Sequence, residues 1–246
     1  MTEKKRERSS AGKKDNYQIY LKQINALARV ARLISSGMYL DELLKLIVHV
    51  TAEVMQSKIC SLMLLDPETK ELVIKSTQSV SERYNNKPNI KLGEGIAGMV
   101  AKDNKLLCSK DVRQDRRYVN REIAKSEAIV SLASVPLAVK GKVIGVLNCY
   151  TSEEHEFSPA ELDILTTVAA QAAAAIENAE LDLRARSAEE ALQTRKLIER
   201  AKEILSQDAN MPPSEAFRLI QKQSMDKRKT MKEIAEAIIL AKDIRS

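Results

Sequence analysis

Four cations gather around the predicted start of the last helix of the chain: Lys227, Arg228, Lys229 and Lys232. The first backbone N–H groups of a helix have no partner inside the helix, and the helix dipole adds positive potential at that end. Cationic side chains and a helix start together attract anions such as phosphate. The sequence therefore predicts a phosphate-binding corner at this position.

Two further pairs of cations could extend this corner into a basic surface. Arg218 and Lys222 are four residues apart on one predicted helix, and Lys196 and Arg200 are four apart on another, so each pair shares a helix face. Acidic side chains are nearly as frequent in this part of the chain, and an ordinary solvated face is the alternative interpretation. The formal net charge of +6 does not decide between them, because much of it lies in the segment 1–14.

Aromatic side chains are nearly absent from the segment 188–246, where Phe217 is the single example. Proteins that bind single-stranded nucleic acids stack bases on aromatic rings, and this region offers no such platform. A nucleic acid bound here would be held by phosphate contacts, by hydrogen bonds from Arg or Lys, and by the shape of a structured loop.

Signals of catalysis or of a bound cofactor are weak. Gly93, Gly95 and Gly98 have GxGxxG spacing, but they follow a hairpin in mid-chain, whereas a dinucleotide site needs an early βαβ unit. His49 and His155 are the two histidines, and no triad, carboxylate pair or ligand cluster for a metal or haem surrounds them. We expect a protein that is not an enzyme and that needs no metal or cofactor.

Several features bear on the compartment in which the protein works. Cys60, Cys108 and Cys149 are far apart and form no CxxC pair, which favours buried thiols over disulfides, with a redox role as the alternative. The apolar run at Val168–Ile176 is too short to span a bilayer, and the N-terminus does not resemble a secretion signal. The sequence favours a cytoplasmic protein.

The first two thirds of the chain alternate between helical and strand patterns. Amphipathic helices are expected at Tyr17–Ile34 and in LDELLKLIVHVTAEVM, followed by a hairpin made of KICSLMLLD and ELVIKSTQSV. A glycine turn then leads into a short helix, and a second hairpin follows in VSLASVPLAVKGKVIGVLNCYTS, with Pro136 at an edge or bulge. This order of elements predicts an α+β domain with an antiparallel sheet.

A long helix is expected after Ser158, where SPAE supplies an N-cap, a proline at the first helical position and a capping glutamate. Apolar residues then recur with the four- and three-residue steps of a coiled coil, which predicts a homodimer or packing on the Tyr17–Ile34 helix. The predicted dimerisation seam comprises Leu162, Leu165, Ala169, Ala172, Ile176, Ala179 and Leu183. The pattern changes register near Ser187, which suggests a domain boundary there.

The segment 188–246 shows helical patterns and no strand pattern. Pro212 and Pro213 separate two helices, and Thr230 with Glu233 forms a capping box that opens a third, so a three-helix bundle is expected. The predicted fold class is α+β, with an antiparallel sheet domain, a long coiled-coil-forming helix and this bundle. The predicted parts are a basic disordered tail at 1–16, a sheet domain at 17–180, a dimerising helix at 158–206 and a helical domain at 188–246.

Residues 20–180 resemble a GAF domain, most clearly in KLGEGIAGMVAKDNKLL, in SVPLAVKGKVIGVLNCY and in EFSPAELDILTTVAAQAAAAIENAEL. The resemblance implies a small-molecule sensor with an antiparallel sheet, whose outer helices form dimer bundles that pass a signal to an output domain. By position in this pattern, an unidentified ligand would be lined by Cys60, Met63, Met99, Cys108, Tyr118 and Tyr150, although core packing explains these residues equally well.

Residues 188–244 are similar to an ANTAR domain in TRKLIERAKEIL and SEAFRLIQKQSMDKRKTMKEIAEAI. The resemblance implies a bacterial transcription antiterminator that binds paired RNA stem-loops as a dimer. Ser224 and Met225 fall in its SMD motif; we interpret Met225 as packing and Ser224 as a turn cap or an RNA contact. The alternatives are a dimeric scaffold whose helical tail binds a protein partner, and a DNA-binding regulator.

Overall fold

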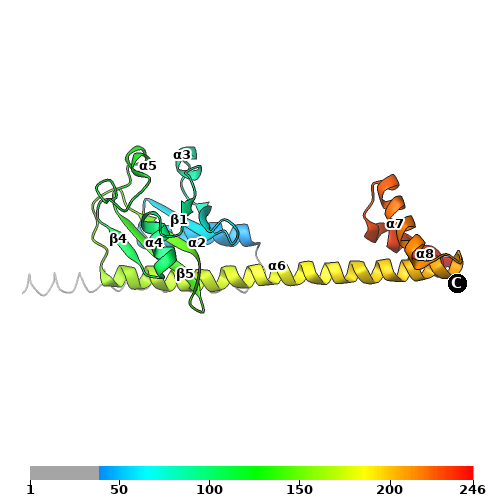
Figure 1. Ribbon diagram of the computed structural model, residues 1–246. Helices are drawn as coiled ribbons and strands as arrows, with labels where there is room; N and C mark the ends of the chain where they lie inside the picture. The colour runs from blue at the N-terminus through cyan, green and yellow to red at the C-terminus, as the bar shows by residue number, and fades with distance from the viewer. Residues whose placement is uncertain (1–38, 246) are drawn as a thin grey trace, which may run out of the picture. The chain divides into compact units, whose positions relative to one another are not determined.

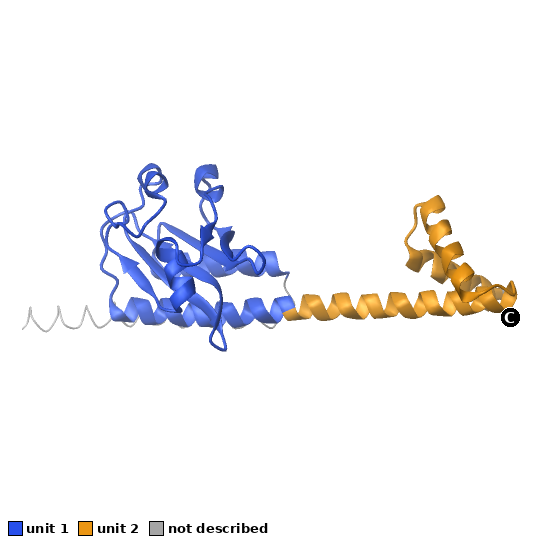
Figure 2. Ribbon diagram, viewed as in Figure 1, with its two compact units in different colours: residues 1–180 blue, residues 181–246 orange. Residues whose placement is uncertain are grey.

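A computed structural model describes residues 39–245 of the chain. Its contacts divide the chain into two compact units, residues 1–180 and residues 181–246, which Figure 2 colours separately. We call them the sensor unit and the helical unit and describe each by itself. The predicted tail 1–16 and the predicted helix Tyr17–Ile34 lie outside the described residues.

The sensor unit is built on a six-stranded antiparallel sheet with strand order β3-β2-β1-β6-β5-β4. Both predicted hairpins are present in it, one formed by β1 and β2 and the other by β5 and β6. The strands are β1 Ile59–Leu65, β2 Glu71–Thr77, β3 Ile90–Lys91, β4 Leu107–Ser109, β5 Leu132–Val139 and β6 Lys142–Tyr150.

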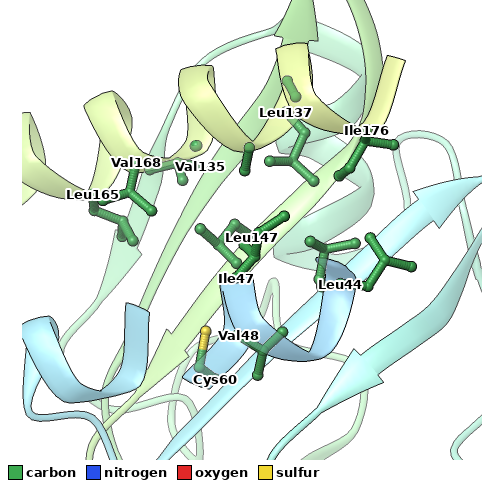
Figure 3. Packing of buried hydrophobic residues seen from close by; sticks show 14 of the residues in the cluster. Leu44, Ile47, Val48, Cys60, Val135, Leu137, Leu147, Leu165, Val168 and Ile176 are labelled. Carbon is green, nitrogen blue, oxygen red and sulfur yellow. The ribbon is translucent and has the colours of Figure 1, made fainter. Parts of the chain in front are cut away.

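One face of the sheet is covered by α2 (Leu40–Met55) and by the N-terminal part of α6 (Pro159–Asp208). Figure 3 shows Leu44, Ile47 and Val48 of α2, and Leu165, Val168 and Ile176 of α6, meeting strand residues such as Val135 and Leu147. We call this the helix-side core. The predicted capping box is present at the start of α6, where Ser158 N donates to Glu161 Oε2 at 2.7 Å and Glu161 N donates to Ser158 Oγ at 3.3 Å.

The opposite face of the sheet carries a second apolar layer, which we call the loop-side core. It receives side chains from three short helices visible in Figure 1: α3 Glu82–Asn85, α4 Gly95–Asp103 and α5 Arg121–Ser126. Gly98 of α4 lies so close to the carbonyl of Lys91 that a Cβ atom there would overlap it, which explains why a glycine stands at this point. The GxGxxG segment is thus a packing turn.

The prediction that this apolar seam of α6 forms a dimer contact is wrong, because the seam packs on the sheet of the same chain. Leu165, Ala169, Ala172 and Ile176 are fully buried in the helix-side core, and Leu162 and Ala179 pack against that core. Of the seven predicted residues, Leu183 alone is exposed, with 64% of its surface accessible. A helix stripe that buries itself on a sheet has the same small apolar residues as one that pairs with another helix.

The helical unit consists of the last turns of α6 together with α7 (Pro213–Lys227) and α8 (Met231–Arg245). Its small core is formed by Ala201 of α6, Ile220 of α7, and Ile234, Ala235 and Ile239 of α8. Proline stands at the start of α7, as the sequence indicates. The helix α6 continues through Ser187, so the register change in its apolar pattern marks a change of packing partner and no break in the helix.

Candidate nucleic-acid interface and sensor site

The turn between α7 and α8 presents three consecutive cations, Lys227, Arg228 and Lys229, all exposed. Arg228 ends α7 in the left-handed conformation at φ 52°, and its N–H donates to the Met225 carbonyl. The Ser224 hydroxyl donates to the Lys229 carbonyl at 2.5 Å, and Lys229 N donates back to the Ser224 carbonyl at 3.1 Å. Ser224 therefore fixes the shape of the turn that displays the cations.

A carboxylate occupies the start of α8, which modifies the predicted phosphate-binding corner. In the capping box, Thr230 N donates to Glu233 Oε2 at 2.8 Å, and Glu233 N donates to Thr230 Oγ1 at 3.2 Å. The hydrogen bond from the Thr230 backbone lowers the pKa of Glu233, so this carboxylate is charged, and Lys229 Nζ lies 3.8 Å from it. An anion at this end would therefore meet the lysine and arginine side chains more than the helix start.

Arg218 and Lys222 lie on the exposed side of α7, opposite the buried Ala216 and Ile220. Met225 follows on the same side with 66% of its surface exposed, so its interpretation as a packing residue is wrong. The outer face of α7 thus carries two cations and an apolar side chain next to the α7–α8 turn. We call the cations Arg218, Lys222, Lys227, Arg228, Lys229 and Lys232, all of them exposed, the turn patch.

Lys196 and Arg200 belong to a different part of the helical unit. Arg200 Nη2 lies 3.5 Å from Asp243 Oδ1, near the end of α8. About 16 Å of helix axis, at about 1.5 Å per residue, separates Asp243 from Lys232 at the other end of α8. Lys196 and Arg200 also line a shallow hollow shared with Glu199 and Glu203, so the charge there is mixed. The structure therefore does not bring all the predicted cations together.

Three tyrosines meet in the loop-side core of the sensor unit. Tyr150 of β6 makes edge-on contacts with Tyr84 of α3 and with Tyr118, at ring-centroid distances of 6.1 Å and 6.5 Å. The Tyr84 hydroxyl donates to Ser61 Oγ at 3.0 Å. Burial raises the pKa of all three phenols, which therefore stay neutral. Met63 is buried in this layer as well, so the structure brings together Met63, Tyr118 and Tyr150 of the predicted ligand residues.

The other predicted ligand residues do not all join this group. Cys60 points to the helix-side core, where its Sγ lies 3.9 Å from Cys149 Sγ, and Cys108 packs against that same core. Cys60 and Met63 stand an odd number of positions apart, so they face opposite sides of the sheet and cannot share a cavity. The assignment of Cys60 to a cavity with Met63 is wrong for this reason. The assignment of Cys108 is wrong because this residue packs against the helix-side core. Met99 is half-buried on α4.

Lys87 is a buried cation that the sequence did not single out. Its exposed fraction is 7%, and its ammonium lies 4.2 Å from the ring centroid of Tyr84 and 5.8 Å from that of Tyr150. Burial lowers the pKa of Lys87 to about 7. Among the described residues, no carboxylate lies within ion-pair distance of this ammonium. The polar segment NNKPN predicts an exposed loop, so the spacing of apolar residues gives no sign that this lysine is buried.

A hollow of about 440 Å³ adjoins the tyrosine cluster, and its wall includes Arg116, Tyr118, Asn120, Arg121, Glu122 and Ile123. In the described part of the chain, the Tyr118 hydroxyl and Arg121 Nε are buried without a hydrogen-bond partner. Tyr118 belongs both to the wall of the hollow and to the tyrosine cluster. The two unpartnered groups can both donate a hydrogen bond.

Comparison with protein families accounts for both units. The GAF domain family matches residues 38–177, more than half of the chain, and the ANTAR domain family matches residues 186–239. The chain is a GAF–ANTAR protein. The sensor unit is its GAF domain, and the α7–α8 turn lies in its ANTAR domain. No helix in residues 39–245 is both long and apolar enough to cross a membrane.

Two curated proteins illustrate the relatives of each domain. The methyl sulfide methyltransferase-associated sensor of Methanosarcina acetivorans is 29% identical to the GAF–ANTAR protein over 171 residues, which are 68% of this chain and 17% of that protein. The transcriptional regulatory protein PdtaR of Mycobacterium tuberculosis is 48% identical over 50 residues, which are 20% of this chain and 24% of that protein. The chain therefore spans less than a quarter of the length of these relatives.

Solved structures resemble the GAF domain. The GAF domain of a phosphoenolpyruvate-protein phosphotransferase from Coxiella burnetii has a TM-score of 0.60 and 26% identity, covering 68% of this chain and 98% of that one. A free methionine-R-sulfoxide reductase from Neisseria meningitidis has a TM-score of 0.57 and 19% identity, covering 65% of this chain and 91% of that one. The likeness to this reductase shows the fold alone and does not indicate its chemistry.

Proposed function

We propose that the GAF–ANTAR protein is a non-catalytic transcription antitermination regulator of the cytoplasm, which binds tandem stem-loops of leader RNA as a dimer under the control of its GAF domain. The observation that carries this proposal is the turn patch, a set of exposed cations displayed by a fixed turn within the ANTAR domain. The similarity over 50 residues to PdtaR, a transcriptional regulatory protein, supports a role in transcription regulation.

The turn patch is suited to the phosphate backbone of a structured RNA, and less to a single-stranded nucleic acid whose bases need stacking partners. Three exposed cations of the patch have no acidic partner within ion-pair distance among the described residues: Lys227, Arg228 and Lys232. The Lys229 Nζ atom lies 3.8 Å from Glu233 Oε1. Phosphate contacts of this kind position a protein on a structured nucleic acid. Phe217 is the single aromatic residue of the helical unit, and one ring cannot provide the row of stacking platforms that binds successive bases of a single strand.

The dimer contact requires a face of α6 other than the buried seam. The segment 181–193 is exposed throughout, and Leu181, Ala185, Ala188 and Leu192 recur within it at the four- and three-residue steps of a coiled coil. We call these four residues the outer stripe. Leu181 and Leu192 each expose 52% of their surface, which a second copy of the chain would cover. A dimer would present two turn patches to two linked stem-loops and so raise the effective concentration of the second contact.

The test is a charge reversal with a matched control. The triple variant Arg218→Glu, Arg228→Glu and Lys232→Glu should lose binding to a tandem stem-loop RNA in a mobility-shift assay, while the dimer remains intact. The control variant Lys75→Glu, Lys105→Glu and Lys142→Glu makes the same change in net charge on exposed lysines of the GAF domain. Equal binding by both triple variants would refute the proposed surface.

A protein partner for the helical unit is the second candidate function. Exposed apolar side chains favour it, since Phe217 exposes 40% of its surface, Met225 66% and Leu240 60%. A salt series separates the two candidates, because RNA binding through phosphates weakens steeply as counterions compete. Competition with duplex DNA tests the remaining alternative, a DNA-binding regulator.

A further inference from the structure

In and beside the loop-side core of the GAF domain lie a buried cation with no acidic partner within ion-pair distance among the described residues and two buried hydrogen-bond donors without acceptors. The Lys87 ammonium is surrounded by the rings of Tyr84 and Tyr150, and the Tyr118 hydroxyl and Arg121 Nε are buried without partners among the described residues. A buried polar group without a partner costs stability, and a buried charge costs more. Each such group needs an explanation, and a bound ligand that supplies the missing acceptor is one.

The three acidic residues of the segment 115–127, which supplies the lining of the hollow, are already engaged. Asp115 accepts from the guanidinium of Arg117 at 2.7 Å, Glu122 accepts from Lys125 at 2.9 Å, and Glu127 accepts from the Ser81 hydroxyl at 2.6 Å. None of these contacts involves Lys87 or the Nε atom of Arg121. The unmet requirement at the tyrosine cluster is therefore for negative charge and for hydrogen-bond acceptors.

We propose that Lys87, Tyr118 and Arg121 form the effector site of the GAF domain and that the effector is a small organic carboxylate, whose carboxyl group they bind. One carboxylate supplies both the charge that Lys87 lacks and several acceptor positions for the free donors. The adjoining hollow of about 440 Å³, with Val119 and Ile123 in its wall, has room for the remainder of a small metabolite.

A carboxylate fits these residues better than a phosphate. Phosphate sites generally combine several cationic side chains with a row of backbone N–H groups. Here Lys87 lies against the rings of Tyr84 and Tyr150. The two arginines of the hollow share its wall with Glu122 and with the apolar Val119 and Ile123, and this mixed lining suits a carboxylate with an apolar body better than a more highly charged phosphate. This inference rests on the sensor role in the proposed function and adds the chemical class of what is sensed.

The test uses the full chain and three probe carboxylates, pyruvate, succinate and benzoate, with benzamide as the neutral counterpart of benzoate. At least one carboxylate should bind with a Kd of about 1 mM or tighter by calorimetry, and benzamide should bind at least about tenfold more weakly than benzoate. Failure of all three carboxylates to bind at about 20 mM would overturn the proposal.

Two variants tie binding to the named groups. Lys87→Met removes the charge and keeps an unbranched apolar side chain, and it should weaken carboxylate binding by at least about tenfold. Tyr118→Phe removes the unpartnered hydroxyl and should weaken it severalfold, whereas Lys105→Met, at an exposed lysine of the same domain, should leave it unchanged. Wild-type affinity in Lys87→Met, with the melting temperature showing a folded domain, would assign the carboxylate to another site.

The same variants separate this inference from the proposed function. RNA binding is measured without carboxylate, where Lys87→Met should equal the wild type because Lys87 lies in the GAF domain. If the wild type binds carboxylates and no RNA, the effector site stands and the antitermination role fails. If it binds RNA and no carboxylate, the reverse holds.

Discussion

The pH dependence of folding stability gives a quantitative test of how Lys87 is buried. In the folded protein, burial holds the pKa of Lys87 at about 7, against 10.5 in the unfolded chain. Between these two values the unfolded chain binds more protons than the folded one, so the stability of the wild type rises with pH over this interval. The cost of burying Lys87 is fully present below pH 7 and disappears above pH 10.5.

The size of the effect follows from the shift. At about 1.4 kcal/mol for each pKa unit, the difference between 10.5 and 7 corresponds to a cost of about 5 kcal/mol at pH 6 and about 2 kcal/mol at pH 9. The Lys87→Met variant carries no such cost, because its side chain does not titrate. Lys87→Met should therefore be more stable than the wild type at pH 6, and this advantage should shrink by about 3 kcal/mol at pH 9.

The assay is urea unfolding of both proteins at pH 6, 7.5 and 9. Tyrosine fluorescence reports on the GAF domain, because the chain has no tryptophan and its six tyrosines all precede Thr151. The Lys105→Met control should show the same difference from the wild type at each pH. An advantage of Lys87→Met that stays constant from pH 6 to pH 9 would mean that the lysine keeps its ordinary pKa, and the effector site would lose its central group.

Three other predictions concern the packing of the two units. Leu181→Lys with Leu192→Lys should shift the protein toward monomer in sedimentation experiments, whereas a dimer of unchanged affinity would exclude the outer stripe. Gly98→Ala should destabilise the GAF domain by about 1–3 kcal/mol in urea unfolding, since a Cβ would overlap the Lys91 carbonyl, and a stability within error of the wild type would contradict that contact. Thr230→Ala should speed hydrogen exchange of the first amides of α8, with a loss of about 1 kcal/mol; unchanged exchange would show that the cap contributes nothing.

Local signals predicted most of the elements correctly. The SPAE segment and the Thr230 to Glu233 box both form the caps that their residue types indicate, because capping depends on neighbours close by in the sequence. The sequence predicts Pro136 at an edge or bulge. In the structure β4 pairs with β5 only as far as Ser134, and the register shifts between Leu137 and Ala138. Features of this kind depend on residues close together in the chain and can be predicted from them.

Features that depend on the third dimension were harder to predict. The sequence pattern of the apolar seam of α6 fits a dimer contact and a sheet contact equally well, because both use small apolar residues at helical spacing. The resemblance to a GAF domain predicts one cavity for Cys60 and Met63, but these residues lie on opposite faces of β1. Lys87 sits in a polar loop whose burial arises from Tyr84 and Tyr150, and Tyr150 belongs to a strand much later in the chain.

The alternation of side chains along β6 links the effector site to α6. Val146 and Tyr150 point into the loop-side core, and Leu147 and Cys149 point into the helix-side core where α6 packs. A carboxylate bound beside Tyr150 would therefore act on a strand whose adjacent residue already contacts the layer that holds α6. Because protein interiors are close-packed, a shift of this strand leaves no empty space to move into, and the neighbouring side chains must move with it. This is a physical route by which occupancy at Lys87 can bias the helix that leads to the ANTAR domain, and it requires no contact between the ligand and α6.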